Sequence, residues 1–195
     1  MKKLLLASAL LLSVGSVQAD QSPKWDSVGI SYQTVDIDGD ELSGFGVSGS
    51  KLLGEDFFAV ASYSYAGDEI EIYNSDLDLD LYSLSAGFGY RYSLTQNADI
   101  FGIVSYESME AEVSYEDESE SETENGYGLQ IGVRTLITEQ IELGASIHYI
   151  DIADTTETAF SASALFNFTD QFSAGVGYNT VDDVDTLSVS AVYFF

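Results

Sequence analysis

The chain ends in Thr186-Leu-Ser-Val-Ser-Ala-Val-Tyr-Phe-Phe195, a stretch in which large apolar residues alternate with smaller ones. Successive side chains of an extended strand point to opposite faces. One face therefore carries a set of apolar side chains, namely Leu187, Val189, Ala191, Tyr193 and Phe195. The other face carries Ser188 and Ser190. The stretch predicts a β-strand with one apolar face and one smaller, more polar face.

Similar alternation recurs along the chain and predicts ten strands. Their ranges are 25–35, 42–52, 57–66, 79–92, 99–113, 127–137, 141–151, 158–168, 172–181 and 186–195. The clearest is 79–92, where Tyr82, Leu84 and Phe88 oppose Gly and Ser residues. Alternation is poorest in 57–66 and 99–113. If two hairpins near those segments are merged, the barrel has eight strands, and this count is the alternative.

The residue types on the two faces indicate a membrane environment. Large apolar residues occupy one face, whereas Gly, Ser, Asn and Gln occupy most of the other. A soluble sandwich or lipocalin-like barrel would instead bury its large apolar residues in a core. In a transmembrane barrel, large apolar residues face the lipid and small or polar residues face the lumen. The predicted fold is all-β, an antiparallel up-and-down transmembrane β-barrel.

The predicted connections alternate between short and long. The short ones are 53–56, 93–98, 138–140 and 169–171, and the longer or more acidic ones are 36–41, 67–78, 110–125, 152–157 and 182–185. Short periplasmic turns and longer outer loops are typical of outer-membrane barrels. Both chain termini are expected on the short-turn side.

The first residues have the pattern of a secretory signal peptide. Lys2 and Lys3 precede an apolar run at 4–14, and Val17-Gln18-Ala19 offers a small-residue cleavage site. The apolar run is too short to span a bilayer as a helix. We expect a signal peptide at 1–19 and a barrel domain at 20–195.

Composition excludes several function classes. The absence of cysteine excludes disulfides, thiolate metal sites and a cysteine nucleophile. Asp and Glu number 33 against six Lys and Arg, for a formal net charge of −27 at pH 7. This sign of charge disfavours a nucleic-acid partner. No cofactor is expected.

These features resemble the small outer-membrane β-barrel proteins of Gram-negative bacteria, including OmpA-like, OmpX-like and opacity-protein-like barrels. The resemblance covers essentially all of 20–195 and rests on the strand pattern, the signal peptide and terminal Phe195. It implies an integral outer-membrane location, contact with membrane lipid and lipopolysaccharide, and a monomer. It also implies that Tyr193 and Phe195 belong to the signal recognised by the barrel-assembly machinery.

One acidic segment stands out within the predicted loop 110–125. Its carboxylates are Glu116, Asp117, Glu118, Glu120, Glu122 and Glu124. Like charges at this density favour a solvated, extended loop. Alternatively, the segment weakly binds Ca²⁺ or Mg²⁺, which prefer oxygen ligands. The run 36–41 lacks EF-hand spacing and is better explained as a turn around Gly39.

The alternation of side chains along each predicted strand places several polar residues on the inward face. Arg91, Arg134 and Glu142 should face inward near the short-turn side, as structural ties or as a selectivity element. His148, the only histidine, should face inward near the outer end. It is either a polar wall residue or the general base of a rim hydrolase. The acids available to such a hydrolase are Asp151, Asp154, Asp182, Asp183 and Asp185.

The favoured function is a structural or surface-interaction protein whose acidic outer loops meet ions, lipopolysaccharide or host molecules. The alternative is a small passive, porin-like channel with weak cation selectivity. A rim hydrolase is a minor alternative, and the expectation is that the protein is not an enzyme.

Overall fold

The computed structural model describes residues 22–37, 39–72, 75–115, 118–153 and 155–195. The predicted signal peptide at 1–19 lies outside the described residues. Within the described ranges, no helix is long and apolar enough to cross a membrane.

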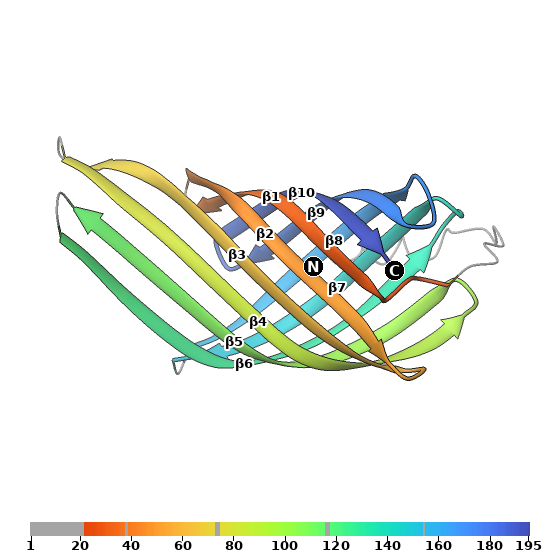
Figure 1. Cartoon of the computed structure of the whole chain (residues 1–195). Helices are drawn as coiled ribbons and strands as arrows, with labels where there is room; N and C mark the ends of the chain where they lie inside the picture. The colour runs from red at the N-terminus through yellow and green to blue at the C-terminus, as the bar shows by residue number, and fades with distance from the viewer. Residues whose placement is uncertain (1–21, 38, 73–74, 116–117, 154) are drawn as a thin grey trace, which may run out of the picture.

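Ten antiparallel strands form a closed barrel in this part of the chain (Figure 1). Their bounds are β1 Ser27–Ile37, β2 Asp40–Leu53, β3 Phe57–Ile72, β4 Ser75–Thr95, β5 Ala98–Tyr115, β6 Glu118–Leu136, β7 Ile141–Ile152, β8 Thr155–Asn167, β9 Phe172–Val181 and β10 Val184–Phe194. Each strand pairs with its sequence neighbours, and β1 pairs with β10. The predicted barrel of ten strands is confirmed, and the eight-strand alternative is wrong.

The wall separates an apolar outer face from an inner face of small residues. Ile30, Phe88 and Ile131 are 64%, 69% and 66% exposed on the outside. A row of inward-facing cross-strand partners crosses four strands, and consists of Ser31, Gly46, Ser64 and Ser83. Lipid would cover the outer face, because an apolar surface of this extent is unfavourable in water.

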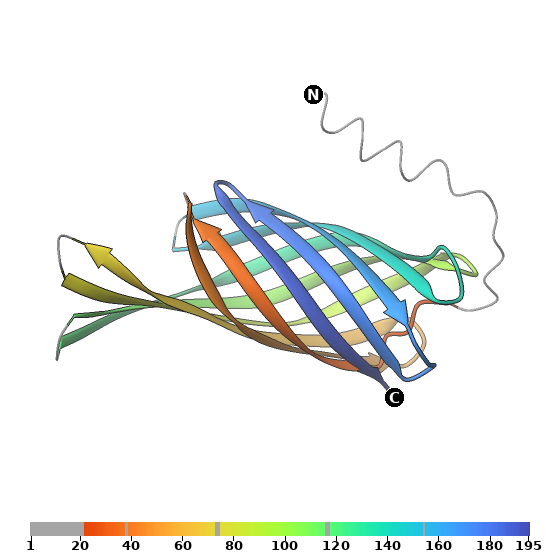
Figure 2. The ribbon, with the colours of Figure 1, turned by 90° about the horizontal axis from the view of Figure 1, so that it is seen from above.

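The two longest predicted loops, 67–78 and 110–125, are wrong. β3 continues to Ile72 before β4 begins at Ser75, and β5 continues to Tyr115 before β6 begins at Glu118. These two hairpins project past the other strands at the barrel end opposite the start of β1 and the end of β10 (Figures 1 and 2). The remaining connections at that end are also short. The strands themselves, rather than loops, extend the protein at this end.

Cross-strand register explains why the acidic segment pairs as a hairpin. The loop expectation rests on like-charge repulsion. On the β5–β6 ladder, Glu110 is opposite Thr123 and Glu112 is opposite Ser121, whereas Glu122 and Glu124 are opposite Ala111 and Met109. Like charges directly opposite each other weaken a sheet, and the β5–β6 register avoids them, although Glu112 of β5 is opposite Asp80 of β4. The ladder can therefore continue through a strongly acidic sequence.

Gly44 allows a close approach of β2 to β3. A Cβ at this position would overlap the backbone of Tyr65 and Ala66. Gly102 of β5 is different, since a Cβ there would meet only the carbonyl oxygen of Gln130, at 3.8 Å. The close approach of β2 and β3 requires glycine at position 44, whereas the space around position 102 accepts a side chain.

Replacement of Gly44 by alanine should destabilise the folded barrel by about 1–3 kcal/mol, because the added methyl group forces the two strands apart. Gly102→Ala is the matched control and should change stability by less than about 0.5 kcal/mol. Urea unfolding in lipid vesicles, followed by Trp25 fluorescence, measures both variants. Equal stability of the two variants would contradict the close-approach argument.

Candidate functional site in the barrel lumen

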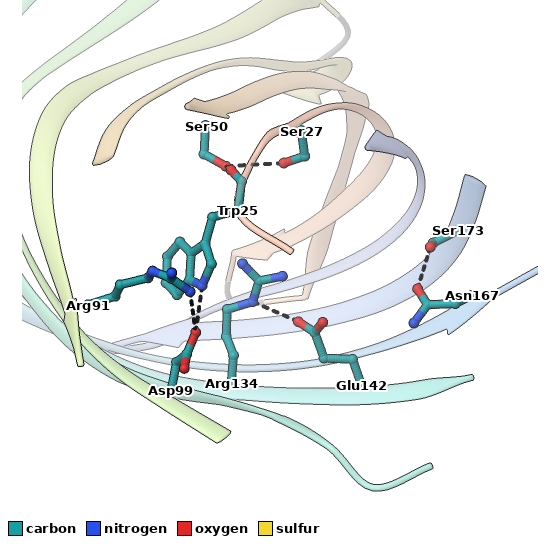
Figure 3. Close-up of polar contacts among 9 residues, drawn as sticks. All are labelled: Trp25, Ser27, Ser50, Arg91, Asp99, Arg134, Glu142, Asn167 and Ser173. Carbon is teal, nitrogen blue, oxygen red and sulfur yellow. Dashed lines mark hydrogen bonds and ion pairs between the residues drawn. The ribbon is translucent and has the colours of Figure 1, made fainter. Parts of the chain in front are cut away.

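Trp25 lies in the lumen at the end where β1 begins and β10 ends. It precedes β1, is 4% exposed, and packs against Phe58 and Phe101 with ring centroids 4.5 and 5.5 Å away. Its indole Nε1 donates a hydrogen bond to Asp99 Oδ2 at 2.8 Å (Figure 3). The Arg134 guanidinium lies 4.6 Å from the indole ring centroid. A bulky side chain thus fills the opening and is held by polar contacts from two strands.

Two ion pairs surround this tryptophan (Figure 3). Arg91 Nη1 donates to Asp99 Oδ2 at 3.1 Å, and Arg134 Nε donates to Glu142 Oε1 at 2.6 Å. Asp99 is fully buried and Glu142 is 4% exposed. Buried charges need such partners, because desolvation of an unpaired ion is costly. We call Trp25, Arg91, Asp99, Arg134 and Glu142 the terminal plug.

Further contacts fix the plug to the rim. Arg91 donates through Nε and Nη2 to the Glu55 carbonyl oxygen, at 3.0 and 2.9 Å. Asp26, next to Trp25, accepts hydrogen bonds from the Leu52 backbone N–H and the Lys51 ammonium. These two donors lower the pKa of the Asp26 carboxyl below its ordinary value, the backbone N–H contributing most. The segment entering the lumen is therefore anchored beside Trp25.

The structure places the predicted inward residues Arg91, Arg134 and Glu142 within the plug. Sequence reasoning missed Trp25 and Asp99. Asp99 and Phe101 both face the lumen. Because large and small residues do not alternate regularly along β5, the sequence does not reveal which of its faces is inward. Trp25 lies before the first strand, where strand parity gives no information.

A second polar cluster lies nearer the opposite end. His148 Nε2 lies 3.3 Å from Glu107 Oε1, and that oxygen also accepts hydrogen bonds from Ser85 at 3.0 Å and from Ser105. The Glu107 side chain is 7% exposed. We call these four residues the acid–histidine network. Glu107 is a functional candidate that sequence reasoning missed, again because β5 alternates poorly.

These contacts do not support the rim-hydrolase interpretation. Among the described residues, His148 has an ion-pair contact only with Glu107, and Ser105 donates to Glu107 rather than to His148. Asp151 and Asp185 instead accept hydrogen bonds from Tyr127 and Tyr178. Asp154 lies outside the described residues. The expected pairing of His148 with outer-rim acids is not seen in the described part of the chain.

The acidic β6 residues lie on one strand face. Glu116 and Asp117 lie outside the described residues, as does the side chain of Glu118. Glu120, Glu122 and Glu124 share parity along β6. Over the described ranges, no three His, Cys, Asp or Glu residues are grouped so as to hold a metal ion. Divalent-ion binding here stays a prediction.

The last residues of β10 lie at the plugged end. Tyr193 contacts Phe172 and Phe195, with ring centroids 5.1 and 6.3 Å away, and Phe195 is 54% exposed. Phe194 points the other way and is 5% exposed. The recognition role of Tyr193 and Phe195 stays a prediction.

The sequence matches the outer membrane protein beta-barrel domain family over residues 4–195. The chain belongs to this family. It is an integral outer-membrane β-barrel of Gram-negative bacteria. In such barrels the longer extensions lie on the outer side, and here the projecting β3–β4 and β5–β6 hairpins form them, so the terminal plug lies at the periplasmic end and the acidic hairpins extend outward.

Solved outer-membrane barrels resemble the chain at low identity. Ail of Yersinia pestis is 18% identical, with 87% of this chain and 96% of that one covered and a TM-score of 0.45. Neisserial surface protein A is 16% identical, with coverage of 88% and 96% and a TM-score of 0.46. The N-terminal barrel of Pseudomonas aeruginosa OprF is 16% identical, with coverage of 88% and 100% and a TM-score of 0.42. No curated protein matches the chain.

Removal of one partner of the buried Arg134–Glu142 pair should strongly destabilise this outer-membrane barrel. We expect Glu142→Ala to cost about 3 kcal/mol, since it leaves a mostly buried guanidinium without its carboxylate. Glu139→Ala, in the exposed turn between β6 and β7, is the matched control and should cost less than about 0.5 kcal/mol. Urea unfolding in vesicles gives both values.

The double variant Arg134→Met/Glu142→Leu should recover much of the lost stability, because it removes both charges together. A Glu142→Ala variant as stable as Glu139→Ala would show that the pair does not tie the wall.

Proposed function

We propose that this protein is a structural, surface-exposed barrel of the outer membrane whose lumen does not conduct. The observation that carries the proposal is the terminal plug, in which Trp25 is 4% exposed and bonded to fully buried Asp99. Ion passage would require the indole ring to leave this position. That movement would break its hydrogen bond and expose its apolar surface to water.

The cavities at the two ends of the barrel support a closed lumen. A cavity of about 410 Å³ at the periplasmic rim is lined by Lys24, Trp25 and Arg91, among others. A cavity of about 840 Å³ at the outer end is lined by Glu107 and His148, among others. The two cavities share no lining residue. Trp25 and Arg91 of the plug line the first cavity, and no plug residue lines the second.

A passive, weakly cation-selective channel is the second candidate. The outer cavity and the Gly- and Ser-rich wall favour it, because a wall of small residues leaves space for water. The acidic outer hairpins would concentrate cations at the mouth. Arg91 and Arg134 would oppose cation passage at the plug. This candidate therefore requires a plug that opens.

Conductance in planar bilayers distinguishes the two candidates. We expect the unmodified barrel to give little or no steady conductance. Trp25→Gly should produce a measurable, weakly cation-selective conductance, with selectivity falling at high salt as the acidic hairpins are screened. Phe88→Ala is the control, since this side chain lies on the outer face and is 69% exposed.

Steady cation-selective conductance of the unmodified barrel would overturn the structural proposal in favour of the channel. A large anion-selective conductance would contradict both candidates, because the mouth is strongly acidic.

The surface role that we propose rests on the β5–β6 hairpin. Glu120, Glu122 and Glu124 form a row of carboxylates with a two-residue spacing. Divalent cations with oxygen ligands could bind along such a row, which by its parity faces the mouth of the lumen. The row would then hold cations at the outer mouth of the barrel.

We expect Ca²⁺ to bind this row weakly, with a Kd of about 10⁻⁴–10⁻³ M, a range seen for extracellular modules. Glu120→Gln/Glu122→Gln should weaken binding several-fold, because it removes two of the adjacent carboxylates. Glu110→Gln/Glu112→Gln removes the same charge from β5 and is the matched control. Calcium titration calorimetry on barrels in vesicles, with and without lipopolysaccharide, is the measurement. Equal loss in both double variants would indicate general charge attraction, not a row-specific site.

A further inference from the structure

Part of the outer cavity has an apolar wall. Besides Gly and Ser residues, its lining includes Val35, Leu81, Met109, Ile150, Val181 and Val184. On one side, Val35 and Leu81 pack in a cluster with buried Leu42 and Ala66. Met109 is 49% exposed although it faces inward. Apolar surface left open in a cavity favours an apolar ligand.

The cavity also contains one partly available carboxylate. Glu107 lines it, and its side chain is 7% exposed. The contacts from Ser85, Ser105 and His148 all converge on Oε1. Among the described residues, Oε2 has no hydrogen-bond or ion-pair partner. This second carboxylate oxygen of a largely buried side chain is thus available for a donor from a ligand, and a carboxylate favours a cationic donor.

The charge around the cavity is mostly negative. Glu110, Glu122, Glu124 and Glu157 also line it, His148 is its one basic side chain, and its described lining contains no Lys or Arg. This arrangement raises the local concentration of cations. A hydrated metal ion fits poorly beside Glu107, because apolar residues lie nearby and no described group of three acidic or histidine side chains could hold it there. The combination favours a cation that carries its own apolar body.

We propose that the outer cavity binds a small organic ammonium ion, whose cationic group contacts Glu107 Oε2 and whose apolar part lies against Met109 and Ile150. The cavity volume of about 840 Å³ lies within the range typical of small-molecule sites. The site lies on the outer side of the terminal plug and shares no lining residue with the periplasmic cavity. Binding is therefore independent of whether the lumen conducts.

Three probes of equal chain length test the charge requirement in the unmodified barrel. Hexylammonium, hexanol and hexanoate are titrated into barrels held in lipid nanodiscs, with empty nanodiscs as the partition control. Hexylammonium should bind at least tenfold more tightly than hexanol, and hexanoate should not bind. Equal binding of all three would overturn the proposal. Methylammonium should bind at least tenfold more weakly than hexylammonium, and equal affinity would overturn the role of the apolar wall.

Variants locate the site. Glu107→Gln keeps the shape of the side chain and should lower hexylammonium affinity at least tenfold. Glu112→Gln is the matched control on the same strand, at outward parity, and should change affinity less than twofold. Ile150→Asn should weaken hexylammonium without affecting methylammonium. Unchanged affinity in a folded Glu107→Gln barrel, verified by its gel shift on heating, would overturn the assignment of Glu107.

Discussion

The pairing of β1 with β10 is the constraint on which the whole structure depends. Eleven residues of β1, Ser27–Ile37, align with the residues of β10 down to Val184. Without this ladder, both strands would present unpaired backbone N–H and C=O groups to lipid, where no water can satisfy them. Closure removes the edges and also creates a lumen. Every polar side chain in that lumen must then find a partner or water inside it.

The lumen meets this requirement differently along its length. At the periplasmic end, buried Asp99 and Glu142 are paired with Arg91 and Arg134, and Trp25 fills the remaining space. Small Gly and Ser residues line the middle. Near the outer end Glu107 relies on hydroxyls and His148 instead of an arginine. A carboxylate without an arginine keeps its negative charge available to a ligand, whereas the carboxylates of the plug are already neutralised.

Local periodicity predicted much of the fold but little of the site. Alternation of large and small residues in segments such as 79–92 gave the strands, their number and the inward parity of Arg91, Arg134 and Glu142. Trp25 lies before the first strand, and Asp99 and Glu107 lie on a strand whose inward face also carries Phe101 and Met109. Some of their partners are distant in the sequence, as Trp25 is from Asp99 and His148 from Glu107, so no local pattern reveals these pairs. The acidic hairpin was missed because like charges along one strand favour a solvated loop, whereas the β5–β6 register places its Glu residues opposite uncharged ones.

The same register connects the acidic hairpin to the lumen. Residues 120, 122 and 124 of β6 continue the parity of Gly128 and Gln130, which face inward lower in the barrel. The carboxylates of Glu122 and Glu124 consequently reach the mouth of the outer cavity. Their field acts together with that of Glu107 further in, so an approaching cation meets negative charge first at the mouth and then at the floor. The alternation of Glu with uncharged residues along β6 therefore allows β6 to pair with β5, and it also directs the carboxylates toward the cavity.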